Sequence, residues 1–414
     1  MFKNTILKQK QEKERFITFS YIERSKGQEA KKWLDSDLIK VIIGPRRSGK
    51  SIFSLMLLKD RPFAYFNFDN EAIQTGEDNF KYDELMQALH NVYGETKTIL
   101  FDEIQNLPRW ELFVNRLQRE GYNLVLTGSN ANLLSQELAT ALTGRHIPIE
   151  ILPFDFKEFL AARQGADPQN ILEQYLLSGG FPEVVVKGLD SKEYLAVLFD
   201  SLLFKDVVKR HKVRFAEQIS NLGSSLINNV ASQYSLRRLA KTLGFRSGVT
   251  LEKYLGYLIE AYIIFSVNRY SYKAGERLRS PKKAYVADNG FVGAKAVQHS
   301  PNTGKLFENL VFIELVKAGF VPNRELFYYL TRNNREIDFM LKKENTIIEL
   351  IQVAHEAHNS DVEERETKAL VEAAQELKVS QLTVITWDEK KELKKSGLTI
   401  NFVPFRERFL SLPT

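Results

Sequence analysis

The chain has 414 residues, of which 43% are hydrophobic and 27% are charged, values that are ordinary for globular domains folding in water. A chain of this length predicts two or three domains rather than one core. The absence of cysteine excludes disulfides, thiolate metal sites and cysteine nucleophiles. A net charge of +6 is compatible with nucleic-acid binding but does not establish it.

Membrane insertion and export are not expected from this sequence. No apolar run reaches the length of a membrane span. Residues 1–8 carry lysines where a signal peptide needs an apolar core. We therefore expect a cytoplasmic protein with no membrane association.

The N-terminal part contains a phosphate-loop pattern, because an apolar run at residues 41–43 leads into G-P-R-R-S-G-K-S and an apolar stretch at residues 52–58. This order predicts a strand, a loop whose backbone N–H groups face a polyphosphate, and a helix. In such a loop Lys50 reaches the β- and γ-phosphates of ATP, and the Ser51 hydroxyl ligates Mg²⁺. The alternative is a glycine-rich turn without a ligand. The residues expected to contact the nucleotide are Gly44, Pro45, Arg46, Arg47, Ser48, Gly49, Lys50 and Ser51.

Two further strands are expected to end beside this loop. Residues 98–103 form an apolar run that ends in adjacent carboxylates, so we expect Asp102 to hold Mg²⁺ and Glu103 to polarise the attacking water. The run at residues 123–128 leads to Ser129 and Asn130, which either sense the γ-phosphate or cap the next helix. With two more strands at residues 63–68 and 147–152, the pattern predicts an α/β fold with a mostly parallel sheet.

Several motifs in the same order resemble the bacterial and archaeal AAA+-type, STAND-related ATPases. The resemblance implies a P-loop NTPase sheet with a small helical lid, and it places Arg145 where a γ-phosphate-sensing or finger arginine acts. A structural pairing of Arg145 with a carboxylate is the other interpretation. The motifs that carry the resemblance are the phosphate loop, L-F-D-E-I-Q at residues 100–105, L-T-G-S-N at 126–130, L-T-G-R at 142–145, L-P-F-D-F-K-E-F-L at 152–160 and G-G-F-P-E-V-V at 179–185.

The middle of the chain is expected to form a winged helix-turn-helix. Apolar positions recur at helical spacing in residues 235–244, and a second amphipathic helix follows in residues 247–260. Strands at residues 263–267 and 283–286 would then flank a basic connection. The connection could contact DNA phosphates, or the module could serve packing between domains. The basic residues of this connection are Arg269, Lys273, Arg277, Arg279, Lys282 and Lys283, against Glu276 alone.

The C-terminal part resembles the PD-(D/E)xK nuclease-like domain that follows the same group of ATPases. Glu308 and Asp338 match the metal-binding positions, if the site is active. The lysine of that motif is missing, because Ala354 follows Gln352 at the required spacing and Ile351 follows Glu349. Two further options stay open: Lys368 replaces that lysine from a later helix, or Asp338 pairs with Arg332 or Arg335 in a retained, non-catalytic fold.

These patterns predict four segments: a P-loop ATPase core at residues 1–160, a helical lid at 161–215, the winged helix-turn-helix at 216–295 and the nuclease-like domain at 296–414. The expected activity is hydrolysis of ATP with Mg²⁺, for which Lys50, Glu103 and Arg145 are the candidate catalytic residues. The alternatives are an ATP-controlled DNA-binding switch and a metal-dependent DNA nuclease. A finger arginine supplied by a second copy would imply a homo-oligomer; protein partners are not predicted.

Overall fold

The computed structural model describes residues 2–70, 80–129, 144–163, 168–296 and 302–411. The described chain forms two compact units, residues 1–154 and residues 155–413.

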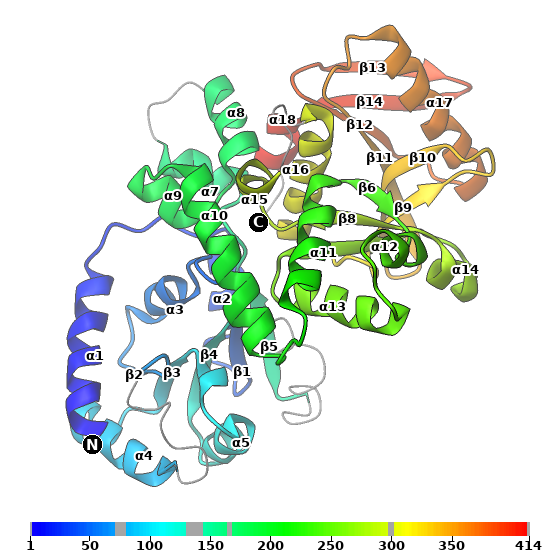
Figure 1. Ribbon diagram of the computed structural model, residues 1–414. Coiled ribbons are helices and arrows are strands. Elements are labelled where there is room, and N and C mark those ends of the chain that lie inside the picture. The colour runs from blue at the N-terminus through cyan, green and yellow to red at the C-terminus, as the bar shows by residue number, and fades with distance from the viewer. Residues whose placement is uncertain (1, 71–79, 130–143, 164–167, 297–301, 412–414) are drawn as a thin grey trace. The chain divides into compact units, whose positions relative to one another are not determined.

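The first unit is built on a five-stranded parallel sheet (Figure 1). The strands have the order β2-β3-β4-β1-β5, and each pairs with its neighbours in parallel. All five residues of β1 are buried, as expected for a central strand covered on both faces. The strands are β1 (Ile39–Ile43), β2 (Ala64–Asn67), β3 (Thr98–Asp102), β4 (Asn123–Gly128) and β5 (His146–Glu150).

Helices cover both faces of this sheet because successive residues of a strand point to opposite sides. Val41 of β1 packs with residues of α1, α4 and α5, whereas its neighbour Ile42 packs with residues of α2 and α3. Each large apolar side chain buried in this way contributes about 1.5–3 kcal/mol. The helices are α1 (Phe2–Ile17), α2 (Gly27–Lys31), α3 (Lys50–Leu58), α4 (Tyr82–Tyr93), the short η1 (Ile104–Asn106) and α5 (Trp110–Arg119).

The edge strand β2 is closed by a side chain of α1. The Gln9 amide accepts from the Asn67 N–H at 3.0 Å and donates to the Asn67 carbonyl oxygen at 3.0 Å. Gln9 thus makes the two hydrogen bonds that a further strand would offer, which blocks edge-to-edge pairing at this position.

The second unit begins with a helical region and a small sheet. The antiparallel sheet has the order β6-β8-β7 and consists of β6 (Ser232–Tyr234), β7 (Ile264–Asn268) and β8 (Lys282–Val286). The helices up to this point are α7 (Phe156–Ala162), α8 (Pro168–Ser178), α9 (Pro182–Lys187), α10 (Ser191–Ser201), the π-helical segment η3 (Leu202–Lys209), α11 (Ala216–Asn228), α12 (Leu236–Thr242), α13 (Gly248–Glu260), α14 (Ala274–Arg279) and α15 (Asn289–Lys295).

The G-G-F motif has a local structural cause in this unit. Gly180 N–H donates to Asp288 Oδ2 at 2.7 Å, and Asp288 Oδ1 accepts from Gly290 N–H at 2.9 Å. A Cβ on Gly179, whose φ is +71°, would lie 1.6 Å from Asp288 Oδ1. The two glycines therefore let the chain wrap around a buried carboxylate that caps α15.

The rest of the second unit is a six-stranded mixed sheet with the order β13-β14-β12-β11-β10-β9. Strands β11, β12 and β14 are parallel to one another, and the others are antiparallel to their neighbours. Its elements are α16 (Thr303–Lys317), β9 (Leu326–Leu330), β10 (Glu336–Lys343), β11 (Thr346–Ala354), α17 (Ser360–Leu377), β12 (Leu382–Thr386), β13 (Lys391–Lys395), β14 (Leu398–Pro404) and α18 (Phe405–Leu410).

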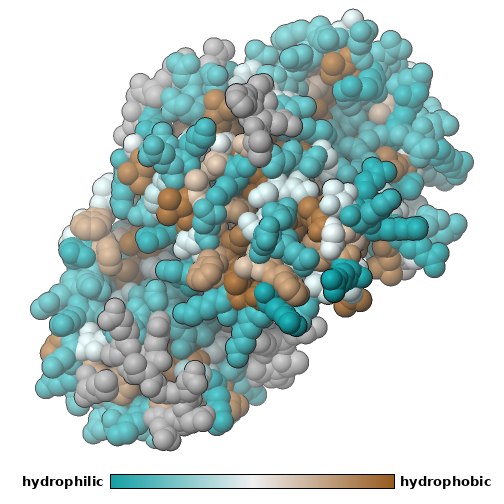
Figure 2. Space-filling model, viewed as in Figure 1, coloured by the Kyte–Doolittle hydropathy of each residue, from teal (hydrophilic) through white to brown (hydrophobic). Residues whose placement is uncertain are grey.

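The expected parallel α/β fold of the first unit is confirmed, and a mixed sheet forms the C-terminal part. The helix that begins at Ser191 changes to π-helical spacing at Leu202. Among the described residues, no helix combines the length and apolarity needed to cross a bilayer. On the visible face, hydrophilic side chains dominate over β12, β13 and β14 (Figure 2).

Candidate functional site

The phosphate-loop sequence forms a tight turn between β1 and α3. Gly44 has φ +144°, and a Cβ there would lie 2.1 Å from the Ile151 carbonyl oxygen, so only glycine fits beside the segment that follows β5. Gly49 has φ +93° and precedes the first residue of the nine-residue helix α3 without a side-chain cap. The loop therefore ends at a helix N-terminus, where backbone N–H groups and the helix dipole favour an anion.

The polar groups of the loop fit an anionic ligand. Ser48 is buried and its Oγ has no hydrogen-bond partner among the described residues. Lys50 is also buried, and its ammonium donates to the Pro45 carbonyl oxygen at 2.8 Å, within the loop itself. Arg24 fixes the loop from behind by donating to the carbonyl oxygens of Ser48 at 2.9 Å and Leu152 at 2.6 Å.

Asp102 lies at the carboxyl end of β3 and is held by three hydroxyl groups. Ser51 Oγ donates to Asp102 Oδ1 at 2.9 Å, and Thr127 on the neighbouring strand β4 donates to the same oxygen. Tyr65 on β2 donates to Oδ2 at 3.1 Å. The two expected Mg²⁺ ligands, Ser51 and Asp102, are thus already in hydrogen-bond contact, and a hydroxyl next to a carboxylate is a donor set that suits Mg²⁺.

The electrostatic environment of Asp102 favours a counter-cation. Burial raises the pKa of Asp102, and the charge of Glu103 raises it further, while hydrogen bonds from Thr127, Ser51 and Tyr65 act in the opposite direction. Burial also raises the pKa of Tyr65 well above its ordinary value, so that side chain remains a donor. A divalent cation at this position would stabilise the ionised carboxylate.

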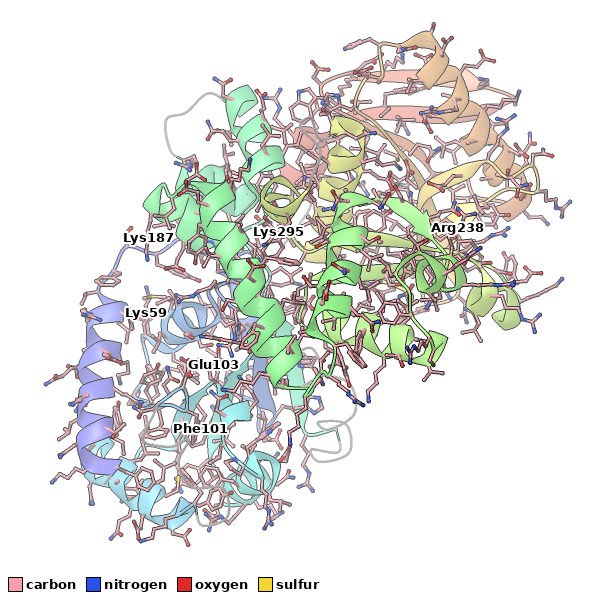
Figure 3. The ribbon with its side chains drawn as sticks, viewed as in Figure 1. Lys59, Phe101, Glu103, Lys187, Arg238 and Lys295 are labelled. Carbon is pink, nitrogen blue, oxygen red and sulfur yellow. The ribbon has the colours of Figure 1, made fainter. Side chains whose placement is uncertain are left out.

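Glu103 adopts an unusual backbone conformation directly after β3 (Figure 3). Its φ is +52° and its ψ +45°, a left-handed conformation that costs a non-glycine residue about 1–3 kcal/mol. Its N–H donates to Thr127 Oγ1 at 2.9 Å, and Gln105 Nε2 donates to its carboxylate. Gln105 Nε2 also lies 3.5 Å from the Oγ of Ser129, which is buried at the end of β4. The structure therefore brings Ser129 and Glu103 together; Asn130 lies outside the described residues.

Arg145 is not brought to this site within its own chain. Its side chain is exposed and it directly precedes β5, whose first residue, His146, pairs with Ile39 at the start of β1. Arg145 is therefore at the amino end of the sheet, whereas the loop follows the carboxyl end of β1. The five residues of β1 separate them by about 16 Å along the strand direction at about 3.3 Å per residue.

The second unit contains a cluster of three carboxylates around one lysine. Oxygens of Glu308 on α16 and of Glu336 and Asp338 on β10 lie within 4.8 Å of one another. Lys283 on β8 donates to Glu308, to Glu336 Oε1 at 2.7 Å and to Asp338 Oδ1 at 3.3 Å. Burial opposes the charge of Lys283, but the carboxylates outweigh it, led by Glu308, and raise the pKa of the ammonium well above its ordinary value.

The structure places three of the residues that the sequence left as options for this cluster elsewhere. Asp338 pairs with Lys283, whereas Arg335 pairs with Glu372 at 3.1 Å. Glu349 lies in a separate ion pair, accepting from Arg408 at 2.7 Å, and so is not the missing acid position. Lys368 is exposed and is not among the cation partners of the cluster.

Gln352, the other candidate for the acid position, serves the backbone of β10. Its Oε1 accepts from Asp338 N–H at 2.8 Å, and its Nε2 donates to the Glu336 carbonyl oxygen at 2.9 Å and to Glu366 at 2.5 Å. The paired register of β10 with β11 begins at Phe339 and Ile351, so Gln352 bonds β10 backbone groups that lie just outside that ladder.

The predicted basic connection between β7 and β8 contains the helix α14 and differs from a uniform phosphate-binding loop. Lys283 is fully buried and unavailable to a phosphate. Arg269 donates to the Leu330 carbonyl oxygen at 3.1 Å, and Lys273 pairs with Glu276 at 3.3 Å.

Several residues that shape these two sites were not predicted from the sequence, and each of their contacts joins residues that are distant in the chain. Tyr65 and Thr127 reach Asp102 from adjacent strands, and Arg24 reaches the loop from before β1. A polar residue in an apolar strand, such as Thr127, is a usable signal for a site. No local signal distinguishes Lys283, since in sequence it is one of several basic residues between Arg269 and Lys283.

Three family models match the chain in sequence. An AAA domain matches residues 36–160. Two domains of unknown function follow, DUF8612 at residues 169–301 and DUF4143 at residues 303–407.

Two curated relatives match most of the chain. Uncharacterized protein MJ1544 of Methanocaldococcus jannaschii is 37% identical over 395 residues, covering 89% of this chain and 87% of that protein. An uncharacterized protein of Haemophilus influenzae is 34% identical over 343 residues, covering 78% of this chain and 84% of that protein. Among solved structures, the Walker-type ATPase paby2304 of Pyrococcus abyssi matches with a TM-score of 0.42 and 15% identity, covering 67% of this chain and 99% of that one.

Proposed function

The chain belongs to the same family as the Methanocaldococcus jannaschii protein MJ1544, and we propose that it binds ATP with Mg²⁺ at its AAA domain and hydrolyses it to ADP and phosphate. The observation that carries this proposal is the meeting of Ser51, Asp102 and Thr127 beside a loop whose backbone turns into a helix N-terminus.

The loop residues would bind the phosphates. Lys50 would exchange its bond to the Pro45 carbonyl oxygen for the β- and γ-phosphate oxygens, and the buried Ser48 hydroxyl would gain the partner that it lacks. Arg24 keeps the Ser48 carbonyl oxygen turned away from the ligand by bonding it. When bound, Mg²⁺ supplies charge neutralisation for the phosphates, and Ser51 and Asp102 would hold it.

Glu103 would act as the residue that orients and polarises the attacking water. Its left-handed backbone ends the extended conformation of β3. Its N–H donates to Thr127, and the Thr127 hydroxyl donates to Asp102, so Thr127 links the two carboxylate residues. Gln105 would be a positioning residue, because it holds the Glu103 carboxylate and approaches Ser129.

Arg145 would contribute only to the site of a second copy, because its own chain places it at the opposite end of the sheet. This proposal is tested by mixing two inactive variants, Arg145→Ala and Lys50→Ala. Partial recovery of turnover in the mixture, together with a mass above that of one chain, supports action in trans. Full activity of Arg145→Ala alone would remove the role.

The decisive test of the ATPase is Glu103→Gln. We expect mant-ATP affinity to stay within about twofold while phosphate release falls about 100-fold or more, the size typical of losing a general base. Glu95→Gln is the matched control, because it makes the same change at an exposed glutamate in the loop before β3, and its turnover should equal that of wild type. Equal turnover in wild type and Glu103→Gln would refute the assignment.

A DNA-binding role is the second candidate, and one observation favours it. The helix α12 has no buried residue, and its Arg237 and Arg238 are exposed. Figure 3 labels Arg238 on this helix. With α13 and the β7–β8 pair, it would form a winged helix-turn-helix whose helix α12 contacts phosphates.

This role predicts salt-dependent duplex binding. Charge reversal of Arg237 and Arg238 should reduce the slope of log affinity against log salt by about 2, since each lost phosphate contact releases about one counterion fewer. Charge reversal of the exposed Lys192 and Lys368 is the control. No binding at low salt would remove the role, and stimulation of ATP turnover by DNA would unite the two proposals.

The remaining assignments of the segments are proposals of the same kind. Residues 161–215 would act as a helical lid and residues 296–414 as a nuclease-like fold. The order of α16, β9, β10, β11, α17 and β12 supports the latter, because it places Glu308 on a helix before the strand that carries Asp338.

A further inference from the structure

Lys283 lies where a divalent cation would lie if the C-terminal carboxylate cluster were a metal site. Its ammonium contacts one oxygen of each of the three carboxylates, Glu308, Glu336 and Asp338. An ammonium has three N–H donors and no acceptor, so these three bonds use its whole capacity.

The six carboxylate oxygens are all bonded by protein groups. Lys283 reaches one oxygen of each carboxylate, as described above. The other oxygen of Glu308 accepts from Lys305 at 3.0 Å, that of Glu336 accepts from Gln233, and that of Asp338 accepts from Val353 N–H at 3.0 Å. Each of the six oxygens thus has a protein donor.

Burial distinguishes this lysine from one that takes part in a reaction. The side chain of Lys283 is 0% exposed. A cavity of about 760 Å³ adjoins the cluster and is lined by Glu308, Glu336 and Asp338, but Lys283 is not among its lining residues. A lysine that activates water or steadies a phosphate must touch a group entering from the cavity, whereas the Lys283 ammonium is enclosed among the three carboxylates.

The residues therefore do not fit the Mg²⁺ that a nuclease-like fold implies. Mg²⁺ requires oxygen ligands at about 2.0–2.1 Å and keeps several waters. The space among these three oxygens is filled by the ammonium of Lys283, which is carried by β8.

We propose that Lys283 is a built-in counter-ion that replaces the divalent cation, so that the carboxylate cluster is a structural lock joining β8 to α16 and β10 and not a metal-dependent nuclease site. The lock makes the small sheet and the C-terminal mixed sheet parts of one compact unit. A structural lock also needs no lysine on β11. At the position where the nuclease motif has its lysine, this chain has Ala354 or Ile351.

The test is the number of Mn²⁺ ions bound per nucleotide-free chain, measured by electron paramagnetic resonance. Wild type and Asp338→Asn should bind equal numbers, because the cluster holds no metal in either protein. Lys283→Met should bind one Mn²⁺ more than Lys283→Met/Asp338→Asn, because removal of the ammonium exposes three ligands. Any ion at Ser51 and Asp102 is common to all four proteins and cancels.

Thermal unfolding gives an independent measurement. Lys283→Met should have a lower Tm than wild type in EDTA and recover several degrees when Mn²⁺ is added, whereas the double variant should not recover. One extra Mn²⁺ in wild type relative to Asp338→Asn would overturn the proposal. A folded Lys283→Met that gains no Mn²⁺ would overturn it as well. If Lys283→Met does not fold with or without Mn²⁺, the comparison of wild type with Asp338→Asn decides.

Discussion

Asp288 should make the second unit less stable as the pH rises, and Asp288→Asn should remove this dependence. The carboxylate is buried, and its two oxygens accept hydrogen bonds from the N–H groups of Gly180 and Gly290. Burial raises its pKa from 3.8 to about 6, and the two backbone bonds offset part of that rise. The folded chain therefore keeps a proton on Asp288 in a pH range where the unfolded chain has lost it.

The sign and size of the effect follow from this difference. Between about pH 4 and pH 6 the folded state binds more protons, so the free energy of unfolding falls as the pH rises. The gap of about two pH units, at 1.36 kcal/mol for each, gives a loss of about 3 kcal/mol that is complete above pH 6. Asp288→Asn also loses one acceptor, which costs about 1–3 kcal/mol, but that loss is the same at every pH.

The assay is urea unfolding of both proteins from pH 4 to pH 7, with Trp387 as the reporter of the second unit. Trp33 and Trp110 lie in the first unit, so replacing both with phenylalanine leaves only Trp387 to report. The stability of wild type relative to Asp288→Asn should decline by about 3 kcal/mol over this range. An exposed substitution, Glu364→Gln, controls for the loss of one charge. A relative stability that stays flat, or that rises with pH, would refute the reasoning.

Two further predictions concern single side chains. Gly179→Ala should destabilise the second unit by about 2 kcal/mol or more, because its Cβ would collide with Asp288 at a positive φ. The control Gly188→Ala, with φ +63° and no atom within 4 Å of the added Cβ, should cost about 1 kcal/mol. Equal losses of the two variants in urea unfolding would contradict this prediction. Gln105→Ala should leave mant-ATP affinity unchanged and slow phosphate release about tenfold, since it frees the Glu103 carboxylate; a weaker nucleotide affinity with unchanged turnover would contradict it.

The parts of the first unit that were predictable are those whose cause is local. A strand buried on both faces is mostly apolar, as at Val41, Ile42 and Ile43, and the turn after it needs a glycine at Gly44, whose φ is +144°. Both constraints are written in consecutive residues, so the sheet and the loop follow from the sequence. The positions of Asp102 and Ser51 at one edge follow in turn from parallel pairing.

The unpredicted parts depend on contacts between elements distant in the chain. Asp338 and Lys283 are 55 residues apart, and a search for lysine within the spacing of one motif cannot find such a partner. Arg145 shows a second limit, since its motif suggested a role but only the register of β5 against β1 shows that it lies at the amino end of the sheet of its own chain. The spacing of residues in the sequence predicts which side chains are neighbours on one helix or strand, whereas a functional site is formed by side chains from several helices and strands.

The two acidic clusters differ in the kind of donor that holds them, and this difference predicts how many divalent cations one chain binds. The three groups that bond Asp102 are neutral hydroxyls, which orient a carboxylate but leave its charge uncompensated. The three carboxylates around Lys283 instead receive the positive charge of a buried ammonium. A buried charge requires a partner of opposite sign, so a cation is favoured at Asp102, whereas the position among the three carboxylates is already taken by the Lys283 ammonium. With ATP present, wild type should therefore bind one Mn²⁺ for each chain, and Asp102→Asn should lose it while Asp338→Asn keeps it.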